Sequence, residues 1–209
     1  MKPYYQDESV TLWHGDCLEP GALAWISADV LVMDPPYGMA KPLTRSAIDV
    51  PIAGDHDTGA RDAALDAWGA RRPAIVFGHW RKPRPMGVCY LVVWDKVHMA
   101  LGAASAAFAT SHEEIYVMGE GWTAGRRPTV MRYPNLLGER RPEHPTLKPV
   151  GLMEQLIQIA PVGTIADPFA GSGSTLIAAR NLGRKAIGVE IEERYCELIA
   201  KRLAQGVLL

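Results

Sequence analysis

The fold class is decided by the stretch Asp167-Pro168-Phe169-Ala170-Gly171-Ser172-Gly173-Ser174-Thr175. It connects an apolar strand expected over 164–166 to a helix expected to start at Ser174. Two glycines let the backbone turn tightly and approach a ligand closely. The free N–H groups of the helix N-terminus favour a carboxylate or a phosphate. Residues 185–190 then form an expected strand that ends at Glu190, whose carboxylate can accept hydrogen bonds from ribose hydroxyls.

This strand–loop–helix–strand unit favours a nucleoside-containing cofactor, although Gly-containing turns also occur in other α/β proteins. The Walker A pattern GxxxxGK[ST] is absent, which argues against a nucleotide-hydrolysing phosphate loop.

The rest of the chain repeats the alternation of strands and helices. Apolar runs, which we expect to be buried on both faces of a sheet, occupy 29–34, 74–77, 89–94 and 114–118, and 10–13 is a further strand candidate. Helices are predicted over 149–160, 174–182 and 192–204, with weaker signals at 60–70 and 101–110. The pattern predicts one α/β domain over residues 1–209, with a mostly parallel sheet and helices on both faces.

Two long irregular segments, about 38–57 and 119–143, interrupt this alternation and favour functional loops.

Composition excludes several classes of protein. The 209 residues are 48% hydrophobic and 22% charged, with a net charge of −1, which excludes a disordered chain and a collagen-like repeat. Three separated cysteines, with Cys89 expected in the core, indicate neither a disulfide scaffold nor a metal site and fit a reducing compartment. The polar N-terminus and the lack of a long apolar run predict a protein without signal peptide or membrane span.

A second motif, Asp34-Pro35-Pro36-Tyr37, follows the expected strand at 29–34. The two prolines fix the backbone and remove two N–H donors, which leaves the Asp34 carboxylate and the Pro35 carbonyl as acceptors. Tyr37 adds a flat aromatic face. Two acceptors beside an aromatic ring suit an exocyclic amino group on a planar base, although the tetrapeptide also fits an ordinary strand-end turn.

Together the two motifs make the sequence resemble a DNA methyltransferase that depends on S-adenosylmethionine and modifies exocyclic amino groups. His144-Pro-Thr-Leu-Lys-Pro149 resembles the family's segment beside the methionine end of the cofactor, and His14-Gly15-Asp16 resembles its short motif before the catalytic strand. The resemblance covers nearly the whole chain. Because the catalytic motif precedes the cofactor loop, it implies the beta group: a Rossmann-like methyltransferase fold with a circularly permuted motif order.

The resemblance also implies the site residues. Asp34, Pro35, Pro36 and Tyr37 would be catalytic, with Tyr37 stacking on a base flipped out of the duplex. Glu190 would hold the ribose, Asp16 would lie near the adenine, and Asp167 with Gly171 would line the methionine end. The full set expected at the cofactor is Asp16, His144, Thr146, Lys148, Asp167, Pro168, Phe169, Gly171, Ser172, Gly173, Ser174, Thr175 and Glu190.

DNA placement is expected from basic residues. The candidates are Arg81, Lys82, Arg126, Arg127 and Arg132, and residues 71–84 contain further arginines and no acid. A solvated charged surface is the alternative for each of them. The segment at 119–143 would be a short target-recognition segment, so sequence selectivity could be low, or could come from the 38–57 loop or a second subunit.

The activity expected is methylation of N6 of adenine in DNA, since the cytosine-N4 enzymes more often carry Ser at the position of Asp34. N4-cytosine methylation is the alternative, and a non-catalytic protein that binds the cofactor and DNA is the rival from another class. The resemblance further implies a cytoplasmic protein of a bacterium or phage, with a homodimer and a cognate restriction enzyme as candidate partners.

Overall fold

The computed structural model describes residues 2–39, 55–97, 107–108, 110–123, 125–134 and 147–205. Within them, nine strands form one sheet: β1 (Tyr5–Gln6), β2 (Val10–His14), β3 (Val30–Met33), β4 (Ala74–Gly78), β5 (Val88–Asp95), β6 (His112–Met118), β7 (Val130–Arg132), β8 (Ile165–Asp167) and β9 (Ala186–Glu190). The helices are a 3₁₀ segment, η1 (Pro20–Ser27), and α1 (Gly59–Trp68), α2 (Val150–Ile159), α3 (Ser174–Asn181) and α4 (Glu193–Ala204).

The strand order in the sheet is β1-β2-β9-β8-β3-β4-β6-β5-β7. From β2 to β4 all neighbours are parallel, whereas β6 runs antiparallel to both β4 and β5. The C-terminal β8 and β9 lie between the N-terminal β2 and β3, so the cofactor loop and the Asp34 motif follow neighbouring strands. This topology confirms the predicted Rossmann-like α/β fold with a mostly parallel sheet.

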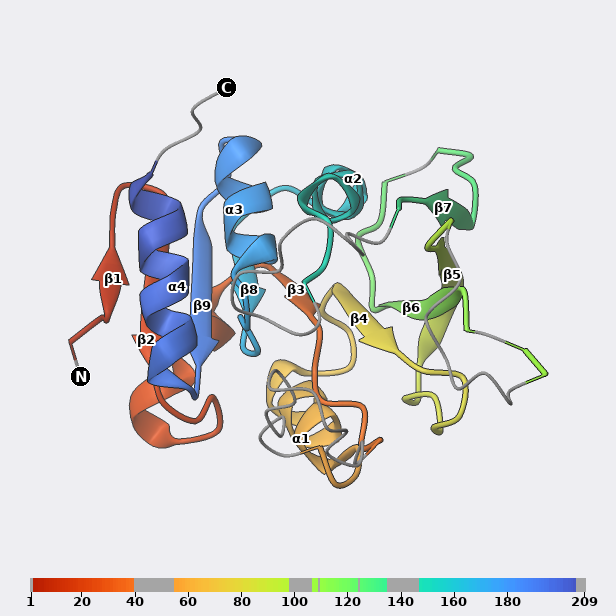
Figure 1. Ribbon diagram of the computed structural model, residues 1–209, viewed down its shortest axis with the longest axis horizontal. Helices are drawn as coiled ribbons and strands as arrows, with labels where there is room; N and C mark the ends of the chain where they lie inside the picture. Colours follow the sequence, from red (N-terminus) through yellow and green to blue (C-terminus); the bar gives the residue numbers. More distant parts are fainter. Residues whose placement is uncertain are drawn as a thin grey trace.

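Helices cover both faces because successive side chains of a strand point to opposite sides. Val30 and Val32 of β3 pack in the cluster that contains residues of α2, α3 and α4. Leu31 and Met33 pack in the other cluster, with residues of η1 and α1. Figure 1 shows α4, α3 and α2 side by side along the sheet, with α1 apart from them below β4. The fully apolar sequence of β3 is therefore explained by burial on both faces.

The prediction that the 89–94 run is buried on both faces is wrong for its first half. Cys89 is exposed rather than in the core, and Tyr90 is 60% exposed. The reason is position in the sheet: β5 lies beside the edge strand β7, which pairs only with Val93–Asp95. Side chains nearer the start of β5 therefore meet solvent.

Helix α2 begins at Val150, so Pro149 is its N-cap rather than its first residue. The helix predicted over 101–110 and most of the 38–57 loop lie outside the described residues. The 119–143 segment is described in part and contains β7. No helix in the described ranges is long and apolar enough to cross a membrane. The single-domain assignment of residues 1–209 stays a prediction.

Candidate active site

One cavity of about 520 Å³ lies at the carboxyl ends of the parallel strands and joins the two sequence motifs. Asp34 follows β3, Asp167 ends β8 and Glu190 ends β9, so their parallel pairing brings the three acids to the same edge of the sheet. Open α/β sheets bind ligands at this edge. The sequence places these residues in two separate motifs, and the fold makes them parts of one site.

Glu190 anchors the cofactor loop to the end of β9. Its Oε2 accepts a hydrogen bond from the N–H of Gly171 at 2.7 Å, and its Oε1 accepts one from the N–H of Glu192 at 2.8 Å. Burial raises the pKa of Glu190, although these backbone N–H groups oppose the shift. Each carboxylate oxygen has a second lone pair, so Glu190 can still accept hydrogen bonds from a ligand in the cavity.

Asp167 lines the same cavity and is 2% exposed. Burial raises its pKa to about 7, even though the Thr175 side chain and the Phe169 N–H both donate to it. A carboxyl group with a pKa near neutrality takes up or releases a proton when a charged ligand arrives.

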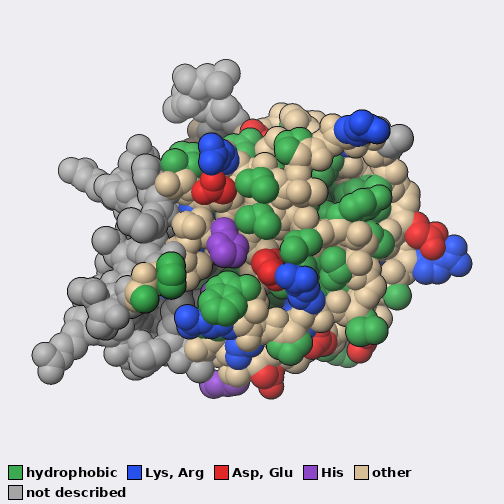
Figure 2. All heavy atoms as spheres, turned by 90° about the vertical axis from the view of Figure 1, so that its right-hand side faces the viewer, with side chains coloured by type: hydrophobic (Ala, Val, Ile, Leu, Met, Phe, Trp, Pro, Cys, Tyr) green, Lys and Arg blue, Asp and Glu red, His purple; other side chains and the backbone are tan. Residues whose placement is uncertain are grey.

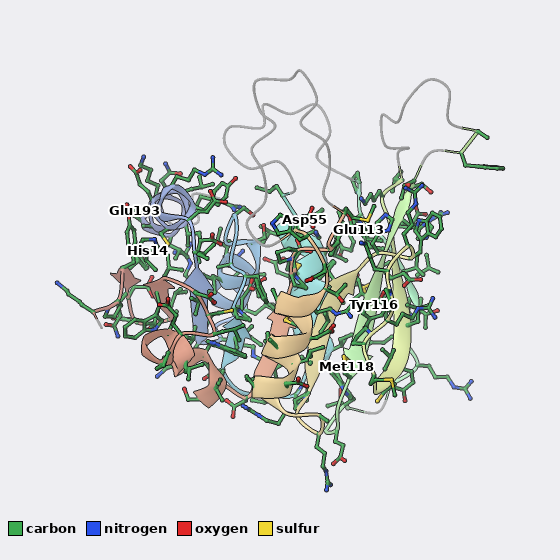
Figure 3. All side chains as sticks on the ribbon, turned by 90° about the horizontal axis from the view of Figure 1, so that it is seen from below. His14, Asp55, Glu113, Tyr116, Met118 and Glu193 are labelled. Carbon is green, nitrogen blue, oxygen red and sulfur yellow. The ribbon has the colours of Figure 1, made fainter. Side chains whose placement is uncertain are left out.

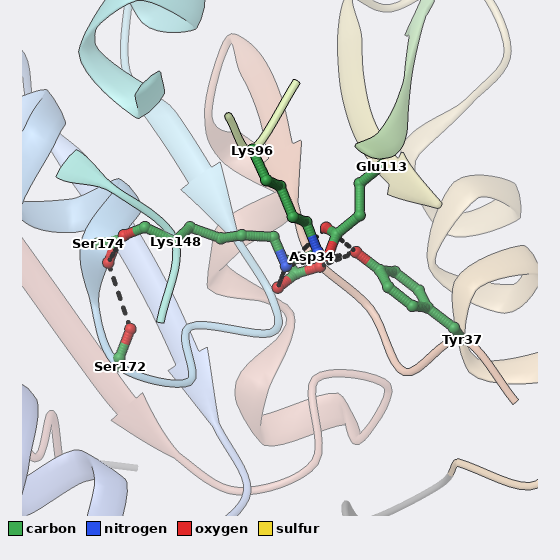
Figure 4. Close-up of polar contacts among 7 residues, drawn as sticks. All are labelled: Asp34, Tyr37, Lys96, Glu113, Lys148, Ser172 and Ser174. Atoms are coloured by element: carbon green, nitrogen blue, oxygen red, sulfur yellow. Dashed lines mark hydrogen bonds and ion pairs between the residues drawn. The ribbon is translucent and has the colours of Figure 1, made fainter. Parts of the chain in front are cut away.

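The catalytic motif forms a hydrogen-bonded group around Asp34 (Figure 4). Tyr37 donates its hydroxyl hydrogen to Asp34 Oδ1 at 2.7 Å, and Lys148 Nζ donates to Asp34 Oδ2 at 2.5 Å. Lys148 Nζ also lies 3.3 Å from the Tyr37 hydroxyl. Lys148 lines the cavity as predicted for a cofactor residue, but the described hydrogen bonds of its ammonium are with Asp34 and Tyr37 of the catalytic motif.

Two charged residues to which the sequence motifs assign no role complete this group. Glu113 Oε2 lies 3.1 Å from the Tyr37 hydroxyl and 3.3 Å from Lys148 Nζ, while Lys96 Nζ lies 2.6 Å from Glu113 Oε1. Figure 3 shows Glu113 at one end of β6, with Tyr116 and Met118 farther along the strand. Because β6 is antiparallel to β4, its start meets the carboxyl ends of the parallel strands. Glu113 could have been predicted as a site residue only if the antiparallel direction of β6 had been known.

Charge and burial oppose one another in this group. Burial raises the pKa of Asp34 against the charge of Lys148, and burial together with the neighbouring carboxylates raises that of Tyr37 well above its usual range. Burial would also raise the pKa of Glu113, but the charges of Lys148 and Lys96 outweigh it and lower the pKa to about 2. The charges of Lys148 and Lys96 therefore favour the ionised form of Glu113.

The predicted cofactor residues fall into three sets. Cavity-lining residues are Asp16, Lys148, Asp167, Pro168, Phe169, Gly171, Ser172, Ser174, Thr175 and Glu190. Gly173 has a φ of 80°, and a Cβ there would come within 2.9 Å of the Ile199 side chain, so it serves close packing of the loop on α4. His144 and Thr146 lie outside the described residues.

The predicted DNA-binding residues are distributed unevenly. Arg81 lines the cavity and packs against the ring of the exposed Trp80, and Arg126 and Arg127 are exposed. Lys82 lines a small adjoining pocket. Arg132 is exposed and lies 3.0 Å from Asp95.

Not all of the arginines at 71–84 present unbalanced charge. Arg71 and Arg84 pair with Glu120 and Glu114, acids that lie outside that segment of sequence. Figure 2 shows the same intermixing, with acidic and basic side chains next to one another on the face at the β5–β7 end of the sheet.

Comparison with known proteins agrees with this geometry. A family model described as DNA methylase matches residues 127–202. The chain is 31% identical over 208 residues to "Putative methylase YubD" of Escherichia coli (strain K12), covering 91% of this chain and 88% of that protein. The chain belongs to the family of N6/N4 amino-group DNA methyltransferases.

More distant relatives and solved structures extend the family assignment. The Type II methyltransferase M.ScaI of Streptomyces caespitosus is 28% identical over 258 residues, covering 97% of this chain and 84% of the relative. The cytosine-N4-specific PvuII DNA methyltransferase superposes with a TM-score of 0.73 at 14% identity, covering 100% of this chain and 91% of that chain. The M1.HpyAVI–SAM complex gives 0.61 at 21% identity, covering 92% and 99%. At these identities the solved structures establish the fold.

Proposed function

We propose that this DNA methyltransferase transfers a methyl group from S-adenosylmethionine to the exocyclic N6 of adenine in DNA. The observation that carries the proposal is that Asp34 opens onto the same cavity as Asp167 and Glu190. A donor held by the two buried acids at β8 and β9 would face a base held at the end of β3. Both reactants would then lie within one site, which replaces a bimolecular encounter by a positioned one.

The cavity fits S-adenosylmethionine in size and in chemistry. Its volume of about 520 Å³ lies within the usual range for small-molecule sites, about 300–1,000 Å³. Glu190 has free lone pairs for the ribose hydroxyls, Asp16 lies at the adenine end, and Asp167 beside Gly171 suits the cationic methionine end. The bound molecule supplies an electrophilic methyl group, whose bonding electron pair stays on its sulfur.

Asp34 would act on the target nitrogen. The lone pair of an exocyclic amine is delocalised into the ring, so hydrogen bonds from the amine to Asp34 and to the Pro35 carbonyl favour a more nucleophilic geometry. The nitrogen lone pair forms the new N–C bond, and the nitrogen then releases one proton to Asp34 or to water. Positioning and electrostatic stabilisation account for the step without a covalent enzyme intermediate.

Access to the amine requires the base to leave the duplex, because the target atom is otherwise stacked and paired. Tyr37 lines the cavity, where its ring would stack on the flipped base. Arg81 and Lys82 beside the cavity, and Arg126, Arg127 and Arg132 farther away, would contact phosphates. The Type II names of several relatives support a cognate restriction enzyme as a partner; a homodimer and a cytoplasmic location stay predictions.

N4 of cytosine is the second candidate. It is favoured by the likeness to the cytosine-N4-specific PvuII enzyme. Adenine is the preferred target because the first residue of the catalytic motif is Asp34. Cytosine-N4 methyltransferases more often have Ser at this position.

Replacement of Asp34 tests the mechanism. Asp34→Ala should lower methyl transfer to DNA by about 10²–10³-fold, the usual cost of one preorganised hydrogen-bonding group. The affinity for S-adenosylmethionine, measured by calorimetry, should stay near that of the parent, because Asp34 would bind the target base and not the cofactor. Asp66→Ala, an exposed position on α1, is the matched control and should keep full activity. Parental activity in Asp34→Ala would contradict the mechanism.

A further inference from the structure

We propose that Glu113, held in place by Lys96, is a positioning residue. When the target amine arrives, Glu113 would accept the hydrogen bonds that Tyr37 and Lys148 otherwise donate to Asp34. The inference rests on the proposed function, because it concerns how Asp34 becomes available to a substrate nitrogen. Nothing in the sequence motifs or in the comparisons assigns a role to either residue.

Asp34 is already occupied by donors of the protein itself. Tyr37 donates to Oδ1 and Lys148 to Oδ2, at 2.7 Å and 2.5 Å. Each Asp34 oxygen keeps a second lone pair for an incoming amine, but an oxygen that already accepts a strong hydrogen bond is a weaker acceptor. Moving one of these donors to another partner would therefore strengthen the hydrogen bond from the amine to Asp34. In a buried site, a donor that loses its acceptor without replacement is costly.

Glu113 is that other partner for both donors. Its Oε2 lies 3.1 Å from the Tyr37 hydroxyl and 3.3 Å from Lys148 Nζ. The Tyr37 hydroxyl carries one hydrogen, so it donates to Asp34 or to Glu113 but not fully to both. A rotation of that hydrogen from Asp34 to Glu113 would free Oδ1 for the amine with no buried donor left unpaired.

Exposure shows which of the two acids the substrate can reach. The Asp34 side chain is 23% exposed, whereas those of Glu113, Lys96 and Lys148 are 13%, 12% and 7% exposed. Both acids line the cavity, and Asp34 is the more exposed of the two, so Asp34 is the carboxylate more accessible to the substrate. Lys96 Nζ, 2.6 Å from Glu113 Oε1, engages the oxygen that the other two donors do not use.

The four charges balance, since Asp34 and Glu113 face Lys96 and Lys148. Asp167 of β8 adds a nearby carboxyl group, and the ring of His79 after β4 lies 6.3 Å from that of Tyr37. Removing the charge of Glu113 leaves the Lys148 charge to act on Asp34 alone. The pKa of Asp34 should then fall, because the negative charge of Glu113 helps to raise it.

Glu113→Gln tests the proposal. We expect kcat for methyl transfer to fall by about 10–100-fold, as for other residues that support a reacting group. The acid limb of the kcat profile should move to lower pH, because transfer needs ionised Asp34. Affinity for S-adenosylmethionine should not change. Glu120→Gln is the control, since it also neutralises a Glu in an ion pair, in this case with Arg71 at the surface.

A double variant, Glu113→Gln with Lys96→Gln, removes one charge of each sign and keeps the group neutral. It should show the same loss of kcat and the same shift of the acid limb to lower pH. If the single variant does not fold, the double variant tests the proposal in its place. A parental kcat, or a lower kcat with an unmoved acid limb, would overturn the proposal and leave Glu113 as a structural ion pair between β5 and β6. Absence of methyl transfer by the parent protein would instead overturn the proposed function.

Discussion

Asp167 shows at the residue scale how burial prepares a group for a charged ligand. Its pKa of about 7 comes mainly from burial, which disfavours the ionised form in the protein without ligand. A cationic methionine end would favour the ionised form, so binding should release a proton near pH 7. The affinity for S-adenosylmethionine should therefore fall by up to about tenfold per pH unit below pH 7.

Isothermal titration between pH 5.5 and 8, in buffers of different ionisation enthalpy, measures both the affinity and the proton release. Asp167→Asn should bind more weakly at pH 8 and lose most of the pH dependence. Stability should change in the opposite sense. An acid whose pKa is raised on folding adds stability at low pH, and that contribution is lost as the pH rises through about 7. If the affinity of the parent protein for S-adenosylmethionine did not change between pH 5.5 and 8, the placement of Asp167 at the cofactor would be contradicted.

Sequence reasoning reached the acids of this site more readily than their partners. Asp34, Asp167 and Glu190 each follow or end an apolar strand, so the prediction of a mostly parallel sheet brings them to one edge. The contact of Lys148 with Asp34 joins residues far apart in the chain, and the motif that contains Lys148 does not encode the direction of its side chain. Glu113 was missed because its place at the site depends on the antiparallel direction of β6.

At the scale of elements, the central strands were predictable and the edge was not. Strands β3, β4 and β8 are buried along their whole length, and their sequences are correspondingly apolar apart from Asp167 at the end of β8. The β5 run looks the same in sequence, yet its first half is exposed because its neighbour β7 is short. Residue composition does not report how much of a strand its neighbour covers.

The segment between β6 and β7 is predicted to contact DNA. Arg126 and Arg127 are exposed there, and replacing both with Ala should weaken DNA binding. The log–log slope of affinity against salt should flatten by about 0.9 for each phosphate that the variant no longer neutralises. Fluorescence anisotropy at salt concentrations from about 50 to about 300 mM measures this slope.

Arg71→Ala is the matched control, because Glu120 already offsets the charge of that arginine. It should change the salt slope less than the double replacement does. Binding of the Arg126/Arg127 variant that follows the parent at every salt concentration would place the phosphate contacts elsewhere, with Arg81 and Lys82 beside the cavity as the next candidates.

At the scale of the whole molecule, the permuted motif order has a spatial explanation. The cofactor loop comes late in the chain, but β8 and β9 insert between β2 and β3. The His14-Gly15-Asp16 motif consequently lies beside the end of β9, where the Gly15 N–H donates to the Glu190 carbonyl at 2.9 Å. The order of motifs along the chain can thus change while the arrangement of strand ends at the site is kept.

The identity of the methylated base tests the proposed function most directly. The purified protein is incubated with DNA and S-adenosylmethionine labelled in the methyl group, and the DNA is then digested and its nucleosides separated. If the protein methylates N6 of adenine, the label will be found in N6-methyladenine. Label in N4-methylcytosine would move the assignment to the second candidate, and DNA without label, from protein that binds S-adenosylmethionine, would contradict the central claim.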